Sequence, residues 1–298
     1  MLDGLLVVDK PAGWTSHDVV AKLRGATRQR RIGHAGTLDP DATGVLLVGL
    51  GRATRLLRFL QETTKEYRGE IAFGIATSTL DAAGEELARA PMPVTEAQVR
   101  AAMPVFVGAI EQVPPMVSAL KVGGRRLHEL AREGKEVERA PRPVTIHAFE
   151  LEGFTPGEYP RATVRVECSS GTYIRTLAAD LGEALGGHAH LATLRRLRVG
   201  AFTLADARPL DDLLATPEAA RLTPAEALRG METHTVPTAA AALIATGRVF
   251  PEAEAPAPVT GPGPFAFVDG DGVLLAVYER SKGRIKPAVV IPPAGTGE

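Results

Sequence analysis

The chain has 298 residues, of which 45% are hydrophobic and 23% are charged, and its formal net charge is -1. This composition is typical of a globular protein with a sizeable core and one large or two ordinary domains, and it excludes a uniformly basic chain. The single cysteine, Cys168, excludes a disulfide within the chain, and no apolar stretch is long enough to span a membrane. We therefore expect a cytoplasmic protein.

The first part of the chain alternates short strands and helices. Apolar residues recur at helical spacing after Ser16, which is a good N-cap, and Thr95 with Gln98 forms a capping box ahead of a later helix. The predicted elements are a strand at 5–8, a helix from Ser16, a buried strand at 45–50, a helix around 56–60, a strand at 67–73 and a helix at 99–103.

The middle of the chain contains a long excursion from the core. The segment from Gln112 to Arg142 holds two consecutive prolines, glycines and many charges, and its pattern is helical only around 127–132. An amphipathic helix at 173–185 and a strand at 194–204 follow. Because strands and helices interleave without a regular βαβ period, the sequence predicts an α+β fold with a mixed, largely antiparallel central sheet and flanking helices.

The composition changes after about Gly230. A short helix at 238–248 and a Pro-, Ala- and Gly-rich loop at 251–264 precede two apolar runs that flank Asp-Gly-Asp-Gly at 269–272, which is a strong hairpin signal. The sequence therefore predicts two domains, residues 1–230 and residues 231–298, of which the second is a small β-rich module.

The run GHAGTLDPDATG places one aspartate, Asp39, directly before Pro40. The proline biases Asp39 away from helical backbone angles, Gly36 and Gly44 permit tight turns on either side, and the strand at 45–50 would anchor the segment. A carboxylate held on a short loop by a core strand is suited to a reactive role. A plain Asp-Pro turn is the alternative interpretation.

Two further residues are candidates for chemistry. Arg175 lies where a strand gives way to a helix, and its guanidinium cannot lose its charge, so beside Asp39 it would hold that carboxylate in the ionised form. Tyr67 lies near the start of a strand. Both residues also have ordinary interpretations, Arg175 as a surface helix residue and Tyr67 as a core aromatic with its hydroxyl at the rim.

Basic residues gather in separate clusters although the chain is nearly neutral. Such clusters suit a polyanion that lies over one face of the protein, and solvated helix faces would give similar runs. The clusters are Lys22 to Arg31, Lys121 to Arg142, the group of Arg195, Arg196 and Arg198, and Arg280 to Lys286.

Seven motifs in a fixed order resemble those of the bacterial tRNA pseudouridine-55 synthases, the TruB family. The resemblance runs from about Leu5 to Gly200 and continues more weakly to the end of the chain. Its carriers are VDKPAGWTS from Val8, GHAGTLDPDATG from Gly33, KEY from Lys65, TSTLDAAG from Thr77, QVPPMVSALKVGG from Gln112, GTYIRT from Gly171 and LRRL from Leu194.

The resemblance implies a role for each matching residue. Asp39 matches the catalytic aspartate, Tyr67 the tyrosine that packs on the target base, and Arg175 the arginine paired with the aspartate. The remaining matches are Lys10 and Pro11, which support the wall of the site, His34, which contacts the RNA near the everted base, Asp81, which contacts substrate, Tyr173, a second pocket tyrosine, and Leu194, which closes the pocket.

The resemblance also implies the reaction. Uridine 55 in the T arm of tRNA would be flipped out and isomerised to pseudouridine by an aspartate-dependent break and re-formation of the glycosidic bond, with no cofactor and no metal. The sequence leaves open whether Asp39 attacks the sugar C1', attacks the base or abstracts a sugar proton. The implied protein is a monomer that binds tRNA, without a protein partner or a membrane, through a thumb-like excursion and a PUA-like tail.

Two residues depart from the family pattern in the excursion. Val117 stands where the family commonly has Tyr or Phe, and His128 stands where it often has Tyr. Both residues lie in the excursion that the resemblance identifies as a thumb over the RNA.

The sequence also has four alternative functional interpretations. Asp39, Asp41 and Thr43 match the D-x-D-x-T pattern of haloacid-dehalogenase-type phosphatases but lack the long apolar strand before it, and Gly49-Leu-Gly51 is a lone glycine pair without the rest of a dinucleotide fingerprint. A tRNA-folding chaperone would need the basic clusters but not Asp39. A guide-RNA-dependent synthase is the nearest enzymatic alternative, and the long excursion favours the stand-alone bacterial type.

Overall fold

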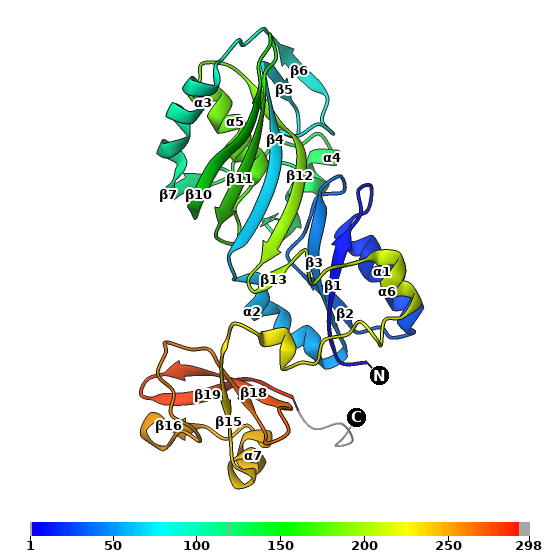
Figure 1. Ribbon diagram of the computed structural model, residues 1–298, viewed down its shortest axis with the longest axis vertical. Coiled ribbons are helices and arrows are strands. Elements are labelled where there is room, and N and C mark those ends of the chain that lie inside the picture. The colour runs from blue at the N-terminus through cyan, green and yellow to red at the C-terminus, as the bar shows by residue number, and fades with distance from the viewer. Residues whose placement is uncertain (1, 119, 292–298) are drawn as a thin grey trace.

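The computed structural model describes residues 2–118 and 120–291 (Figure 1). Within these residues, ten strands form one mixed sheet in which only the β1–β14 and β3–β12 pairs are parallel, so the predicted fold class is confirmed. The strands are β1 (Gly4–Lys10), β2 (Ile32–Ala35), β3 (Thr43–Leu50), β4 (Lys65–Phe73), β7 (Gly108–Gln112), β10 (Arg142–Thr155), β11 (Arg161–Cys168), β12 (Ala189–Val199), β13 (Phe202–Thr203) and β14 (Arg208–Pro209).

The strand order places the ends of distant segments side by side. The main path is β14-β1-β3-β12-β4-β11-β10-β7, with β2 beside β3 and β13 beside β12. The two strands that bring the candidate residues together are β3 and β12, which meet through Thr43 and Gly44 opposite Arg195 and Arg196. A two-stranded hairpin of β5 (Ile75–Thr77) and β6 (Glu86–Arg89) extends from the end of β4.

Helices cover both faces of this sheet. The helices are α1 (Ser16–Thr27), α2 (Leu57–Gln61), α3 (Glu96–Ala102), α4 (Leu127–Arg132), α5 (Ile174–Ala184) and α6 (Leu210–Ala215), with 3-10 turns at Gly51–Leu56, Met103–Phe106 and Glu226–Leu228. The alternate residues Leu6 and Val8 of β1 join the core beneath α1, α3, α5 and α6, whereas Leu5 and Val7 join the cluster beneath α2. Both faces of β1 are therefore buried. No helix in the described ranges is long and apolar enough to cross a membrane.

The N-terminal boundary of α1 differs from the prediction by one residue. Thr15, not Ser16, is the N-cap: its side chain accepts a hydrogen bond from the Asp18 amide, and the Asp18 carboxylate accepts from the Thr15 amide. Thr15 can do this because it has extended backbone angles while Ser16 is already helical. The Ser16 hydroxyl is left to bind elsewhere, and it binds the backbone of Leu38.

The strand predicted at 194–204 is also wrong in its bounds. β12 begins at Ala189 and ends at Val199, where Gly200 has a φ of 55° and turns the chain back into β13. α5 ends at Ala184, and the chain passes through Gly186 and Gly187 directly into β12. The helix predicted at 99–103 begins earlier, at Glu96, behind the predicted Thr95–Gln98 capping box.

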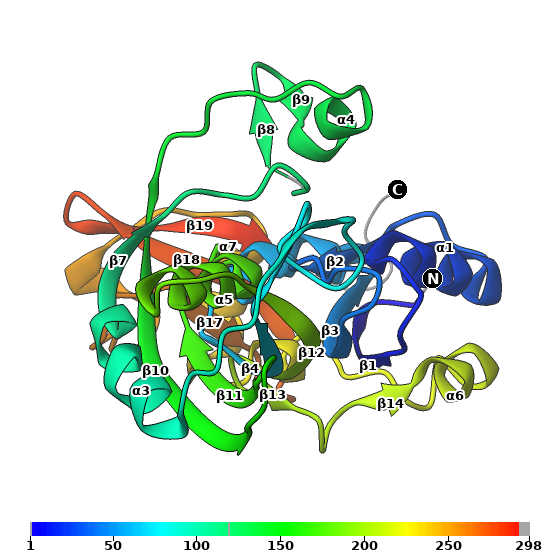
Figure 2. The same cartoon turned by 90° about the horizontal axis from the view of Figure 1, so that it is seen from above.

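The excursion between Gln112 and Arg142 is confirmed and has a defined base. Gln112 and Arg142 are paired across β7 and β10, so the chain leaves and re-enters the sheet at adjacent positions. Figure 2 shows the excursion reaching out from the body, with α4 and a small hairpin at its far end. That hairpin, β8 (Lys121–Val122) and β9 (Arg125–Arg126), was not predicted from the sequence.

A second sheet is formed by the end of the chain. Within the described residues its five strands are β15 (Glu232–Thr235), β16 (Phe250–Pro251), β17 (Phe265–Val268), β18 (Leu274–Ser281) and β19 (Arg284–Val290), accompanied by α7 (Thr238–Ala245) and a 3-10 turn at Glu252–Glu254. The predicted hairpin is confirmed, because Asp269 accepts hydrogen bonds from the amides of Asp271 and Val273 between β17 and β18.

The C-terminal sheet shares an apolar cluster with the rest of the protein. Ala53, Leu56 and Leu228 pack in one cluster with residues of β17, β18 and β19. Arg58 of α2 also forms an ion pair of 2.9 Å with Glu279 of β18. The tail is therefore packed against α2 and its preceding turn, and removing the tail would expose that apolar surface.

Candidate active site

Asp39 lies in the loop between β2 and β3, as predicted. Its neighbour Leu38 is buried, and the Ser16 hydroxyl accepts a hydrogen bond from the Leu38 amide at 2.9 Å and donates one to the Leu38 carbonyl at 3.2 Å. The Asp39 side chain is 42% exposed. The loop thus presents a half-buried carboxylate, while the residue before it is fixed in the core.

Arg175 meets Asp39 from the first turn of α5. Its side chain is 5% exposed, and its Nε and Nη2 atoms lie 3.1 and 3.3 Å from the Oδ2 and Oδ1 atoms of Asp39. The two nitrogens of one planar group therefore bind both oxygens of one carboxylate, which is the geometry that arginine forms and lysine cannot. The predicted pairing of these two residues is present in the structure.

The rest of the Arg175 guanidinium is held from the β5–β6 hairpin and the excursion. Nη1 donates to the carbonyl of Thr79 at 3.0 Å and lies 3.3 Å from Oδ2 of Asp81, while Nη2 also donates to the carbonyl of Val117 at 2.9 Å. The contact with Val117 is made by its backbone, so the departure of its side chain from the family pattern leaves this bond intact. The side chain of His128 lies outside the described residues.

The start of α5 is positioned by an amide that the sequence analysis missed. The buried Gln112 at the end of β7 accepts a hydrogen bond from the Tyr173 amide at 3.0 Å and donates one to the Tyr173 carbonyl at 3.2 Å. Tyr173 is the N-cap of α5 and has no side-chain cap of its own. A reciprocal side-chain amide pair of this kind leaves no local sequence signal, because its members are far apart in the chain.

Asp39, Arg175 and Leu194 form a shared wall between two cavities. The first, which we call the Tyr67 cavity, has a volume of about 450 Å³ and is lined by Tyr67, Tyr173, Lys65 and Arg196 among others. The second, which we call the Asp81 cavity, has a volume of about 610 Å³ and is lined by Asp41, Arg68, Glu70, Asp81 and Arg195 among others. The structure therefore gathers Asp39, Tyr67, Asp81, Tyr173, Arg175 and Leu194 at one place.

Burial sets the protonation of the groups around this wall. It raises the pKa of the Asp39 carboxyl above its ordinary value; Arg175 opposes this rise, and Asp81 adds to it. Burial also raises the pKa of the Tyr67 phenol, which stays protonated, and lowers the pKa of the Lys65 ammonium to about 8. The wall thus holds one carboxylate whose charge depends on pH and one permanently charged guanidinium.

The other predicted residues lie behind or beside the cavities. Lys10 is fully buried, and its ammonium donates to the carbonyls of Pro11, Trp14 and Pro40 at 2.9, 2.6 and 2.8 Å. Burial lowers the pKa of Lys10 to about 8. Of the described residues that line the two cavities, none is Lys10, Pro11 or His34. Lys10 lies behind the cavities, where its ammonium binds the carbonyl of Pro40, the residue that follows Asp39.

His34 lies in β2, with its ring 5.3 Å from that of His17 in an edge-on arrangement. Burial is the main cause that lowers the pKa of His34 to about 4, and the neighbouring His17 and Arg196 contribute to the same direction. The imidazole of His34 is therefore neutral near pH 7. Among the described residues, no three His, Cys, Asp or Glu side chains are grouped so that they could hold a metal ion.

The basic clusters differ in how far their side chains are buried or paired with other groups of the protein. The group at 195–198 was expected on the surface, but Arg196 is 1% exposed, Arg195 pairs with Asp9, and Arg198 pairs with Glu66 and Glu167. Arg280 is likewise bound within the tail, to the carbonyls of Gly261 and Val259. In contrast, within the described ranges no carboxylate pairs with the exposed side chains of Lys22, Arg24, Arg28, Arg30 and Arg31.

Comparison with known proteins shows which family this chain belongs to. Residues 24–174 match the N-terminal domain of TruB family pseudouridylate synthases, and residues 175–233 match the tRNA pseudouridylate synthase B C-terminal domain. The chain belongs to the TruB family of pseudouridine synthases. It is therefore an isomerase that acts on RNA uridine, and the two domain matches meet at Arg175, in the middle of the site.

Curated relatives in the family are similar over almost their whole length. The chain is 45% identical over 305 residues to tRNA pseudouridine synthase B of Arthrobacter sp., covering 99% of this chain and 98% of the relative. It is 45% identical over 296 residues to the protein of the same name from Thermobifida fusca, covering 97% and 99%. The Symbiobacterium thermophilum protein of that name is 52% identical over 247 residues, covering 83% and 82%.

Solved structures with a similar fold include chains of complexes that contain Cbf5. A chain in the crystal structure of a Cbf5-Nop10-Gar1 complex is 26% identical, with a TM-score of 0.74, covering 97% of this chain and 85% of that chain. A chain in the archaeal box H/ACA sRNP Nop10-Cbf5 complex is 25% identical with a TM-score of 0.69. Because the match to the first of these chains covers 97% of this chain, it includes the C-terminal sheet.

Proposed function

We propose that this TruB-family protein converts uridine 55 in the T arm of tRNA to pseudouridine. Asp39 is the carboxylate that acts on the target nucleotide, Arg175 is its counter-ion, and Tyr67 packs on the base. The observation that carries the proposal is the position of the Asp39–Arg175 pair in the wall of a cavity that Tyr67 also lines. Relatives named tRNA pseudouridine synthase B, 45% identical over nearly the whole chain, support tRNA as the substrate.

The chemistry of the isomerisation agrees with these groups. The bond between N1 of uracil and C1' of the ribose breaks, the base turns, and a bond forms between C5 and C1', while C5 loses its proton and N1 gains one, so that the product is an isomer of uridine. The reaction needs an ionised carboxylate next to the target nucleotide, and near pH 7 the guanidinium of Arg175 supports that form of Asp39. It also needs the base to leave its stack, which costs a few kcal/mol that stacking and phosphate contacts offset.

The remaining residues of the site are proposed to act on the nucleotide or on its surroundings. Tyr173 and Leu194 line the Tyr67 cavity and would contact the flipped nucleotide, while Asp81 holds the far side of Arg175 and would contact substrate in the Asp81 cavity. His34 would meet the RNA as a neutral imidazole. Lys10, with Pro11, supports the wall by fixing the carbonyl of Pro40.

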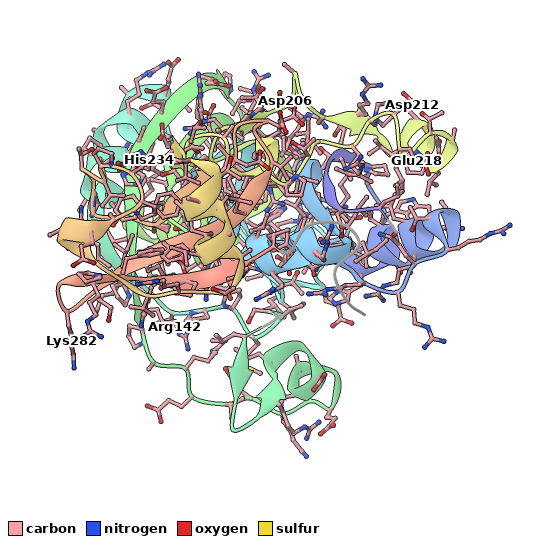
Figure 3. The ribbon with its side chains drawn as sticks, turned by 90° about the horizontal axis from the view of Figure 1, so that it is seen from below. Arg142, Asp206, Asp212, Glu218, His234 and Lys282 are labelled. Atoms are coloured by element: carbon pink, nitrogen blue, oxygen red, sulfur yellow. The ribbon has the colours of Figure 1, made fainter. Side chains whose placement is uncertain are left out.

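The proposed RNA-binding face is the side from which the excursion projects. Figure 3 shows Arg142 and Lys282 toward that side, whereas Asp206, Asp212 and Glu218 lie toward the opposite one. This distribution would attract a polyanion to one face of a nearly neutral protein. We propose that residues 1–230 form the catalytic domain and residues 231–298 a PUA-like RNA-binding module. We further propose that the protein works as a monomer in the cytoplasm without a protein partner.

A second activity, folding of tRNA without catalysis, is favoured by one observation. The exposed cations from Lys22 to Arg31 lie outside both cavities and would bind phosphates whether or not Asp39 acts. The two activities are separable, since a chaperone would keep its effect on tRNA folding after the carboxylate of Asp39 is removed.

The experiment that tests the proposed function maps pseudouridine along an unmodified tRNA transcript after incubation with the protein. We expect one modified position, uridine 55, and none in a transcript that carries cytidine there. An isolated T-arm stem-loop should also be modified. Modification at another uridine, or dependence on an added guide RNA, would contradict the proposal.

A further inference from the structure

Arg196 is a large, fully buried side chain at the back of the site. Its exposed fraction is 1%, and its guanidinium makes three hydrogen bonds to backbone carbonyls: Nε to Val45 at 2.7 Å, Nη1 to Thr37 at 3.3 Å and Nη2 to Gly36 at 3.1 Å. No carboxylate in the described part of the chain forms an ion pair with it. A buried charge of this kind is tolerated because every nitrogen is used in a hydrogen bond.

The three carbonyls belong to the two ends of the loop that carries Asp39. Gly36 and Thr37 come directly before the loop residue Leu38, and Val45 lies in β3 beyond it. The loop has few backbone hydrogen bonds of its own, apart from that of the Ala42 amide to the Asp39 carbonyl at 3.2 Å. Its shape therefore depends on side-chain donors, and Arg196 supplies the largest number of them.

The approach of Arg196 to the loop is built into the sheet. Arg196 lies opposite Gly44 in the β12–β3 pair, and a Cβ atom at Gly44 would lie 2.1 Å from the Arg196 carbonyl oxygen. Gly44 also has a φ of 102°, which side-chain-bearing residues rarely adopt. The glycine lets the two strands come close enough for the Arg196 side chain to reach the loop carbonyls.

The same arginine is also adjacent to Tyr67. Arg196 and Tyr67 are opposite each other in the β12–β4 pair, and both line the Tyr67 cavity. One residue thus holds the loop that presents the carboxylate and lies beside the tyrosine in the neighbouring strand.

We propose that Arg196 is a positioning residue that fixes the separation between Asp39 and Tyr67 by holding the Asp39 loop through the carbonyls of Gly36, Thr37 and Val45. This inference rests on the proposed function, since it assigns the two ends of that spacing to the carboxylate and the base. Arg196 acts through the loop and does not contact the RNA. Loss of its hold would slow the chemical step, because displacement of a reacting group by about 1 Å costs on the order of 100-fold in rate.

The test compares Arg196→Lys and Arg196→Met with the wild-type protein. The donors of an ammonium all lie on one nitrogen, whereas Arg196 reaches its three carbonyls from three different nitrogens of a wider planar group. Arg196→Lys therefore keeps the charge but cannot reproduce these three hydrogen bonds. The control is Arg221→Met, which removes a half-buried arginine that donates to the Asp3 carbonyl far from the cavities. The readouts are the single-turnover rate at saturating tRNA, the dissociation constant for tRNA, the melting temperature, and amide hydrogen exchange across residues 33–42.

We expect Arg196→Lys to lower the saturating rate by about 100-fold, to leave the dissociation constant within about threefold, and to speed exchange in 33–42. Arg221→Met should lower the melting temperature but change neither the rate nor that exchange. A full rate in Arg196→Lys, or a slow rate with unchanged exchange in 33–42, would overturn the proposal. If Arg196→Met does not fold, Arg196→Lys alone decides. If the wild-type protein makes no pseudouridine, the proposed function fails, whereas the exchange data still test the hold on the loop.

Discussion

Arg175 binds Asp39 through two different nitrogens, Nε at 3.1 Å from Oδ2 and Nη2 at 3.3 Å from Oδ1. The guanidinium cannot rotate away, because the carbonyls of Thr79 and Val117 hold its two other edges. A group fixed on several sides is pre-organised for the charge it faces, and such pre-organisation is a large contribution to catalysis. The geometry of this pair, beyond its charge, is therefore expected to matter.

Arg175→Lys should be a poor substitute. A lysine ammonium can reach one carboxylate oxygen and not two, and the bonds to Thr79 and Val117 would be lost with the planar fork. We expect the single-turnover rate to fall by about 100-fold or more, as for the loss of one pre-organised donor. The matched control, Arg89→Lys, alters an exposed arginine paired only with Glu86 in β6 and should keep the full rate. Full activity of Arg175→Lys would show that the two-point contact has no functional role.

The acid limb of the pH profile should lie above the ordinary range of an aspartate. Burial raises the pKa of Asp39, and the ionised form is the active one, so activity should rise with pH through this raised pKa and level off near neutrality. The measurement is kcat/KM against pH for the free enzyme, with tRNA binding followed at each pH. A rate that stays constant down to about pH 4 would contradict the assignment.

Asp81→Asn should move this acid limb to lower pH. The negative charge of Asp81 is one cause of the raised pKa of Asp39, so its removal makes the Asp39 carboxyl easier to ionise. The control is Asp180→Asn, since burial raises the pKa of Asp180 on α5 to about 6 and it could produce an acid limb of its own. The limb should shift in Asp81→Asn and remain in Asp180→Asn. The reverse result would assign the limb to Asp180.

The sequence predicted those elements that are fixed by residues close together in the chain. The capping box of Thr95 and Gln98, the helix at 127–132 and the Asp269 hairpin were all found where expected, because caps and turns are fixed by residues a few positions apart. Asp39 was likewise placed correctly on a loop, since Pro40 excludes a helix there.

The supports of the site could not be predicted in the same way. Arg196 is separated from Gly36 by 160 residues, and in the sequence it is indistinguishable from its surface neighbours Arg195 and Arg198. Ser16 was interpreted as a helix cap, because the same hydroxyl suits both roles and only the tertiary fold brings Leu38 beside it. Contacts between distant segments depend on how the strands are ordered, and no local pattern specifies that order.

Binding to tRNA should weaken steeply with salt although the net charge is -1. The exposed cations from Lys22 to Arg31 would displace counterions from phosphates, so a roughly fourfold rise in salt should cost on the order of 10³-fold in affinity. Arg28→Gln and Arg30→Gln should each reduce the salt slope by about 1. Arg100→Gln, in an exposed pair with Glu96, should leave it unchanged. Equal slopes in all variants would show that this cluster does not contact RNA.

Truncation after Gly230 should lower stability and tRNA affinity but not the chemical step. The fully buried Leu56 packs in a cluster with tail residues, and exposing a side chain of this size costs about 1.5–3 kcal/mol. All the described residues that line the two cavities come before the cut. The melting temperature should fall and the dissociation constant should rise, while the saturating single-turnover rate stays nearly unchanged. A soluble, folded truncation with a collapsed saturating rate would show that the tail takes part in the reaction.

The most direct test of the account is the single-turnover formation of pseudouridine at position 55 of an unmodified tRNA by Asp39→Asn beside the wild-type protein. Asparagine has nearly the same shape but cannot serve as an ionised nucleophile or base. The account predicts that the variant keeps its melting temperature and most of its affinity for tRNA, and forms no detectable pseudouridine. Retention of even about a tenth of the wild-type rate would contradict the central role of the Asp39 carboxylate.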